Sequence, residues 1–376
     1  MRIYVVRRGD SLYSIAKTAG VSVRTLARIN AVSDASRLCV GQAIVIPDGA
    51  LPDRETEICG CACPGIGSRE LEEILPRLTY LCPFSWRIDS GGGITPIADE
   101  DMISAARRHG CAALLTLTNI GSNGGFSSEI AHEVFTNAAS QRSLIENTLS
   151  VLRRRGYYGV NLNIGYAQPY DREGYNELLK RLSESLHANG YTLTSTVAPK
   201  TSDTQNGILY TAHDYEAHGV YSDRVVIMTY EWGYTYSPPR AVSPVNEMRR
   251  VLDYAVTRIP PQKILLGFSN YGYNWRLPWR QGQPAQVISN AAAAELAASV
   301  FAQIGFDEGA KAPHFNYTDP DGVRREVWFE DARSAAARLS LVREYALAGI
   351  SIWTVNMKNP AGLAILDSEF SAEKLI

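Results

Sequence analysis

The sequence has little of what marks a membrane, secreted or nucleic-acid-binding protein. No run of about 18 apolar residues is present, so we expect no membrane span. The first residues show neither an apolar stretch nor a small-residue cleavage site. We therefore expect no signal peptide and synthesis in the cytoplasm. The net charge of −2 gives no positive surplus for nucleic acid.

Cysteine is also scarce, since the 376 residues include only 6, too few for a disulfide scaffold. Cys59, Cys61 and Cys63 alternate along one predicted strand, which places the three thiols on one face. We interpret them as small buried side chains; a thiol site or a crosslink is the alternative. The sequence predicts no metal site and no cofactor.

What is present is typical of a soluble globular chain, with 45% hydrophobic and 20% charged residues. Residues 1–48 form a small unit of their own. A strand at 3–6, a helix capped by Ser11, a second helix from Ser22 and a strand at 43–46 give the order βααβ. Residues 49–56 are polar and contain Gly and Pro, which indicates a linker.

The small unit resembles a LysM domain. The residues that carry the resemblance are Tyr4-Val5-Val6, Gly9-Asp10-Ser11-Leu12, Ser14-Ile15-Ala16, Leu26, Asn30, Val40-Gly41-Gln42 and Ile46-Pro47. The resemblance implies binding of N-acetylglucosamine-containing glycan in a groove between two loops. The groove residues it implies are Gly9, Asp10, Ser11 and Leu12 on one side and Leu38, Val40 and Gly41 on the other. For Asp10 and Ser11, helix capping and turn formation are equally good explanations.

Residues 57–376 alternate short apolar runs with amphipathic helical stretches. The eight predicted strands are 57–63, 78–84, 113–117, 159–164, 192–197, 224–229, 263–268 and 349–355. Eight such alternations predict an α/β fold, a (β/α)₈ TIM barrel; an open doubly wound sheet is the alternative. The long gap before the last strand, about residues 274–338, predicts a small α+β insertion with a hairpin at Asp321-Gly322.

Several predicted strand ends, and one stretch of the insertion, carry motifs similar to those of family 18 glycoside hydrolases. They are Met228-Thr229-Tyr230-Glu231-Trp232-Gly233, Gly267-Phe268-Ser269-Asn270-Tyr271-Gly272-Tyr273, Trp328-Phe329-Glu330-Asp331 and Gly349-Ile350-Ser351-Ile352-Trp353-Thr354. With the LysM unit, the chain resembles the N-acetylglucosaminidases of bacterial spore-cortex lysis. The resemblance implies substrate-assisted hydrolysis, in which a glutamic acid after the fourth strand protonates the leaving oxygen and an aspartate orients the acetamido group.

The stretch that aligns with this catalytic motif has lost its carboxylates. It reads Tyr158-Gly159-Val160-Asn161-Leu162-Asn163-Ile164-Gly165, with Gly165 at the acid position and Asn163 at the orienting position. Tyr158 replaces the first aspartate, and we expect its bulk to perturb the start of the strand. Gly165 cannot deliver a proton, so we expect a protein that binds glycan without cleaving it and has no catalytic residue in this motif.

The resemblance implies a sugar-binding cleft formed by Asn163, Tyr230, Glu231, Asn270 and Trp353. The expected partner is peptidoglycan or a chitin-like glycan, and the expected location is the spore coat, the cortex or the cell envelope. Two alternatives remain open. One is an active hydrolase with a non-standard acid, for which Glu231, Asp171 and Glu173 are the candidates. The other is a structural component of the spore coat or envelope.

Overall fold

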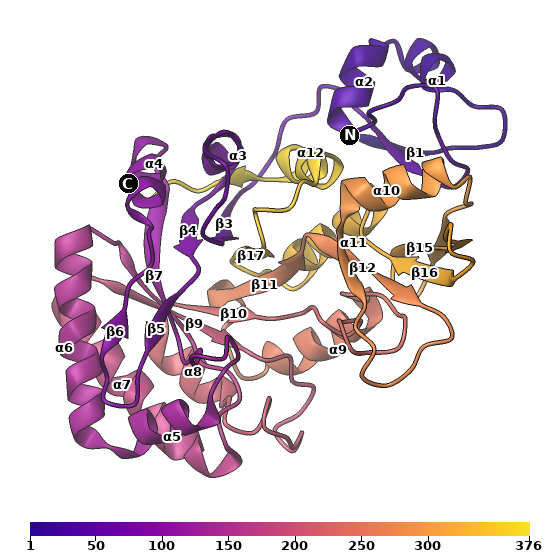
Figure 1. The fold of residues 1–376 in the computed structure, drawn as a ribbon. Helices are drawn as coiled ribbons and strands as arrows, with labels where there is room; N and C mark the ends of the chain where they lie inside the picture. The colour runs from indigo at the N-terminus through magenta and orange to yellow at the C-terminus, as the bar shows by residue number, and fades with distance from the viewer.

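The computed structural model describes residues 1–376, which form a small module joined to a large barrel (Figure 1). The module consists of β1 (Arg2–Val5), α1 (Leu12–Ala19), α2 (Val23–Ile29) and β2 (Ala43–Ile46). The two strands pair antiparallel, so the predicted βααβ order is confirmed. Ser11 and Ser14 form a capping box at the start of α1, and Gly20 ends that helix at a φ of 70°.

The large domain is a closed barrel of eight parallel strands. They are β3 (Glu55–Ala62), β4 (Tyr80–Pro83), β7 (Ala112–Thr118), β8 (Gly159–Asn163), β9 (Thr192–Val197), β10 (Arg224–Ile227), β11 (Ile264–Ser269) and β17 (Gly349–Trp353). Each strand pairs with the next, and β17 pairs with β3. Closure confirms the TIM barrel and excludes the doubly wound alternative. Short strands β5 (Trp86–Ile88), β6 (Ile94–Thr95) and β18 (Ser371–Ala372) extend the sheet.

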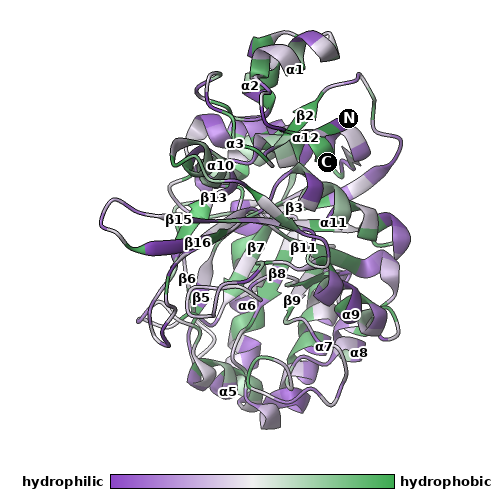
Figure 2. Ribbon diagram, turned by 90° about the vertical axis from the view of Figure 1, so that its right-hand side faces the viewer, coloured by the Kyte–Doolittle hydropathy of each residue, from purple (hydrophilic) through white to green (hydrophobic).

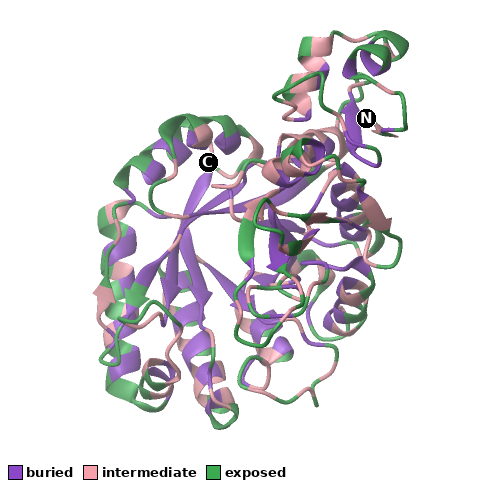
Figure 3. Ribbon diagram, turned by 45° about the vertical axis from the view of Figure 1, so that its right-hand side comes forward, coloured by how far each residue is buried: buried purple, intermediate pink, exposed green.

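Helices surround the barrel, with their polar faces toward solvent and their apolar faces on the buried strands (Figures 2 and 3). The α-helices are α3 (Ser68–Ile74), α4 (Glu100–Arg108), α5 (Ser128–Thr136), α6 (Ala138–Arg155), α7 (Arg172–Ala188), α8 (Tyr215–Tyr221), α9 (Val245–Ala255), α11 (Ala332–Glu344) and α12 (Pro360–Glu369). Three 3₁₀ turns join them to strands: η1 (Leu75–Arg77), η2 (Pro169–Asp171) and η3 (Pro261–Lys263). This arrangement leaves the strand ends free to carry a site.

The predicted α+β insertion lies between β11 and β17. It contains β12 (Tyr271–Arg276), β13 (Gln286–Ser289), α10 (Asn290–Ser299), β14 (Gly305–Asp307), β15 (Ala312–Thr318) and β16 (Arg324–Trp328). The hairpin between β15 and β16 turns at Gly322, whose φ is 76°. The expected bounds of 274–338 need correction, because the inserted sheet begins at Tyr271 and α11 already belongs to the helical shell. The far boundary was missed because the helical pattern of α11 does not distinguish a helix of the insertion from a helix of the shell.

The cysteine run lies mostly inside the barrel. Cys59 and Cys61 on β3 are buried, and Cys63, just past the strand, is half-buried. The Cys59 sulfur lies 3.4 Å from the sulfur of Cys82 on the neighbouring strand. The interpretation of the run as small buried side chains is confirmed for Cys59 and Cys61.

The LysM-like module is packed against the barrel domain by its second loop. The Ile304 amide of the insertion donates to the Val40 carbonyl at 2.9 Å, and Arg333 donates to the Gly41 carbonyl at 3.1 Å. A Cβ at Gly41 would lie 1.9 Å from the Ile304 carbonyl oxygen, so only glycine allows this approach. Helix α2 and strand β2 also contact α12.

Candidate active site

The end of β8 carries the aligned motif residues. Asn161 is buried, and its side-chain oxygen accepts a hydrogen bond from the Thr196 hydroxyl at 3.0 Å. Asn163, two residues further, points to the same side of the strand because strand side chains alternate. The Asn163 side chain has no hydrogen-bond partner in the protein, so its amide is available to a ligand.

Gly165 is held by its backbone and covered by an aromatic ring. The Asn119 side chain accepts from the Gly165 amide at 3.0 Å and donates to the Gly165 carbonyl at 2.8 Å. A Cβ on Gly165 would lie 2.9 Å from the Phe126 ring. Phe126 in turn stacks on Tyr166, with ring centroids 6.3 Å apart. The space beside Gly165 is therefore filled by Phe126, which our sequence reasoning missed because the loop carries no motif.

Tyr158 lies at the opposite end of β8 from these residues. Its ring is 6.5 Å from that of Tyr80 on β4, and its backbone amide donates to the Ala113 carbonyl at 2.8 Å. The strand begins normally at Gly159, so the expected perturbation of its start does not occur. The phenol fits because it packs against Tyr80 at the base of the barrel.

Glu231 follows β10 with a left-handed backbone, at a φ of 68°. Its carboxylate accepts hydrogen bonds from the Tyr271 hydroxyl and, at 3.0 Å, from the Tyr273 hydroxyl. The residue as a whole is exposed, and its carboxylate lies between the two tyrosine hydroxyls. Burial raises its pKa above the ordinary value, and the two tyrosine hydrogen bonds oppose this shift.

Tyr230 and Trp353 lie beside this group. Both are half-buried and pack against the cluster that contains Tyr271 and Tyr273. Burial raises the pKa of the Tyr230 hydroxyl well above its ordinary value, so it stays protonated as a hydrogen-bond donor. The Trp353 ring is held edge-on by Phe84 at a centroid distance of 4.7 Å. The structure therefore brings Tyr230, Glu231 and Trp353 together around Tyr271 and Tyr273.

Asn270 has a structural position instead. It is buried, and its amide nitrogen donates to the Thr354 carbonyl at 3.2 Å and to the Met357 carbonyl at 2.7 Å. These bonds hold the loop that follows Trp353. Asn270 thus contributes to the expected site indirectly, because it holds the loop that follows Trp353.

The other two candidate acids lie outside the cleft. Asp171 is buried on η2, where its carboxylate is 2.6 Å from the His132 ring. Glu173 is exposed on the outer surface of α7, beside Asn176 and Lys180. Glu231 is therefore the one of the three candidates that reaches the cleft.

The LysM residues divide into accessible and buried positions. Gly9 and Ser11 are exposed, Leu38 is half-buried, and Val40 is 37% exposed. The Asp10 carboxylate accepts from the Tyr4 hydroxyl at 2.7 Å and the Arg7 amide at 2.8 Å. Leu12 lies in the module's core and Gly41 against the insertion, so neither can offer a side-chain surface to a glycan.

No group of three or more His, Cys, Asp or Glu side chains is arranged to hold a metal ion. None of the helices combines the length and the apolar character that crossing a bilayer would take.

The sequence matches the family "Glycosyl hydrolases family 18" over residues 101–358 and the LysM domain over residues 4–47. This chain belongs to glycosyl hydrolase family 18. It is 36% identical to the cortical fragment-lytic enzyme of Bacillus subtilis, covering 100% of this chain and 99% of the relative. The crystal structure of the Bacillus cereus spore cortex-lytic enzyme SleL aligns with a TM-score of 0.83 and 38% identity, over 99% of this chain and 87% of that one.

A further solved relative is the putative sporulation-specific glycosylase YdhD of Bacillus subtilis. Its TM-score is 0.70 and its identity 34%, over 73% of this chain and 90% of that one. The recognition of a LysM domain fused to a family 18 barrel is confirmed. The expectation of a protein that binds glycan without cleaving it is contradicted, because relatives that align over the full chain are named as lytic enzymes.

Proposed function

We propose that the protein is a glycoside hydrolase that cleaves N-acetylglucosamine-containing glycan of the bacterial cell wall, with spore cortex as the substrate. The LysM module and the barrel both belong to glycan-recognising families, and the full-length relatives are named for cortex lysis. The accessible LysM residues Asp10, Ser11 and Val40 would retain the polymer while the barrel acts on it.

The proton donor in this proposal is Glu231. Gly165 has no side chain, and Phe126 fills the adjacent space. Glu231 lies on the same rim of the barrel as Asn163, because both follow the carboxyl ends of parallel strands. A carboxyl whose pKa is raised keeps its proton closer to neutral pH, which is what a general acid requires.

The neighbouring groups suit substrate-assisted cleavage. Asn163 offers an unpaired amide to the acetamido group, Tyr230 a phenolic hydroxyl, and Trp353 a flat ring face for the sugar. In this scheme the acetamido oxygen attacks the anomeric carbon, the bond to the leaving oxygen breaks, and Glu231 gives that oxygen its proton. Water then opens the oxazolinium ion, and its proton returns to Glu231.

The observation that carries the proposal is the position of the Glu231 carboxylate, which follows β10 at the strand-end rim and is held by the Tyr271 and Tyr273 hydroxyls. The test compares Glu231→Gln with Glu173→Gln, a matched change on the outer surface of α7. We expect Glu231→Gln to lower kcat by about 10²–10⁴-fold and Glu173→Gln to leave it unchanged. Equal rates for wild type and Glu231→Gln would remove Glu231 from the role of proton donor.

A further inference from the structure

Strand β2 joins the LysM module to the barrel domain, because it is buried on both of its faces. Ile44 and Ile46 belong to the core of the module, whereas Ala43 and Val45 belong to the main core of the barrel domain. Side chains alternate along a strand, so one face of β2 packs within the module and the other packs on the barrel. This shared strand fixes the orientation of the module relative to the barrel.

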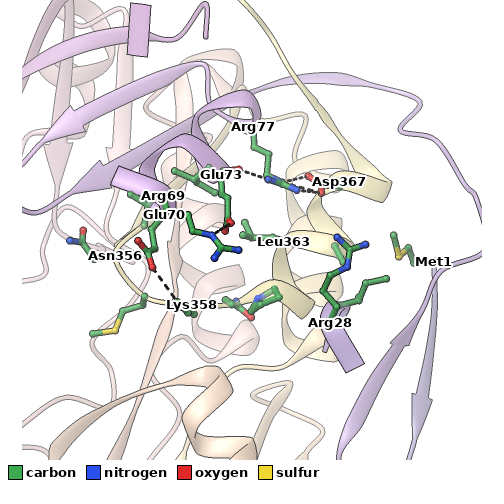
Figure 4. A pocket seen from close by; sticks show the side chains of 17 residues that line it. Met1, Arg28, Arg69, Glu70, Glu73, Arg77, Asn356, Lys358, Leu363 and Asp367 are labelled. Atoms are coloured by element: carbon green, nitrogen blue, oxygen red, sulfur yellow. Dashed lines mark hydrogen bonds and ion pairs between the residues drawn. The ribbon is translucent and has the colours of Figure 1, made fainter. Parts of the chain in front are cut away.

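The polar contacts between the module and the barrel domain are few and lie close together. A pocket of about 710 Å³ lies between Met1 and Arg28 of the module and helix α12 (Figure 4). The ion pairs that line this pocket join barrel residues to one another: Arg69 with Glu73, Arg77 with Asp367, and Lys358 with Glu70. Both hydrogen bonds between residues 1–48 and the barrel domain come instead from the insertion and from the start of α11, where Ile304 and Arg333 are the donors.

These two hydrogen bonds go to the loop that we expect to form the second side of the glycan groove. The Ile304 amide donates to the Val40 carbonyl at 2.9 Å, and the Arg333 guanidinium donates to the Gly41 carbonyl at 3.1 Å. Cys39, which precedes Val40, is buried in the hydrophobic cluster of the insertion. The Val40 side chain is 37% exposed. The barrel domain therefore holds the loop by its backbone and by Cys39, and leaves the Val40 side chain available to a ligand.

Arg333 is itself held in place by the barrel domain. Its Nε and Nη2 atoms donate to the Asp331 carboxylate at 3.0 Å and 2.6 Å. Its guanidinium carbon lies 4.1 Å from the centre of the Phe306 ring, within the range of a cation–π contact. A side chain that is already ordered loses little conformational freedom when it makes a further contact. Arg333 therefore fixes the Gly41 carbonyl relative to the barrel at little entropic cost.

We propose that the insertion and α11 of the barrel domain build one side of the LysM glycan groove, and that Arg333 is a positioning residue for glycan binding by the module. The inference rests on the proposed retention of glycan by the module and not on hydrolysis. Without the Arg333 contact, the loop has to be ordered when the glycan binds, and that ordering lowers the affinity. The affinity of the module thus depends on a residue 292 positions further along the chain than Gly41.

The test is calorimetry of the full chain with a hexamer of N-acetylglucosamine. All proteins carry Glu231→Gln, so that the oligomer stays intact and any binding in the barrel cleft is common to all of them. We expect Arg333→Gln to weaken binding by the module about three- to tenfold, as the loss of one hydrogen bond does. Arg333→Lys should recover most of this loss, because its ammonium group can still donate to the Gly41 carbonyl. Arg325→Gln is the matched control, because Arg325 pairs with Asp319 inside the insertion and its side chain is 21% exposed, against 17% for Arg333.

A second background separates positioning of the groove from a general loss of stability. Val40→Asp places a charge on the exposed part of the groove and should abolish binding by the module, so Arg333→Gln should cause no further loss in this background. Unchanged affinity in Arg333→Gln or in Val40→Asp would overturn the inference. An equal loss in Arg325→Gln, or a full further loss in the Val40→Asp background, would also overturn it. A parent protein that binds no hexamer would overturn the proposed retention of glycan as well, so the two failures are distinguishable.

Discussion

The contact between Gly165 and Phe126 leads to a double-mutant prediction. A Cβ at position 165 would lie 2.9, 3.0 and 3.2 Å from three atoms of the Phe126 ring, whereas ordinary contacts are 3.4–4 Å. The φ of Gly165 is not in the left-handed region, so alanine fits the backbone. Because the clash is with the ring alone, we expect Gly165→Ala to cost about 1–3 kcal/mol, as overpacking does.

The same substitution should cost almost no stability in a variant that lacks the Phe126 ring. In a Phe126→Ala background the Cβ of Gly165→Ala enters open space, so the coupling energy should be about as large as the cost of Gly165→Ala alone. The assay is the free energy of unfolding of the four proteins in urea, followed by tyrosine and tryptophan fluorescence. An equal cost of Gly165→Ala in both backgrounds would refute the claim that Phe126 fills this space.

Three further predictions follow from the site and its support. Hydrolysis should fall as pH rises through the raised pKa of Glu231, since only the protonated carboxyl can donate; a kcat–pH profile without this limb would contradict it. Burial lowers the pKa of His213 from 6.5 to about 4, so the folded state binds its proton less well than the unfolded state, and stability should drop by about 3 kcal/mol as pH falls from 6.5 to 4. Unfolding measured against pH should show a shallower drop in His213→Gln. Asn270→Ala should raise KM for glycan more than it lowers kcat, because it frees the loop after Trp353; an unchanged KM would show that the loop does not support the cleft.

The barrel could be predicted from sequence because its strands and helices carry strong periodic patterns. The run 192–197, for instance, is apolar or β-branched except at Ser195 and forms β9 with the expected bounds. The insertion's far boundary could not be predicted, because a helical pattern alone does not tell whether α11 belongs to the insertion or to the helical shell. The order and type of the elements were thus better determined than the ends of the insertion.

The site was predicted less completely than the fold. The proximity of Tyr230, Glu231 and Trp353 could be predicted because they lie at strand ends within family motifs, and parallel strands bring their ends together. Phe126 and Asn119 were missed, because their contacts to Gly165 join segments far apart in the chain without a local pattern. Gly41 lies against the insertion because of how the module packs on it. A contact between two distant segments cannot be predicted from the pattern of either segment alone.

The most direct test of the proposed function is mass spectrometry of the products that purified protein releases from spore-cortex glycan. We predict soluble fragments with new N-acetylglucosamine reducing ends, formed by wild type and by Glu173→Gln and strongly reduced in Glu231→Gln. Intact glycan after prolonged incubation with folded wild-type protein would contradict the proposal.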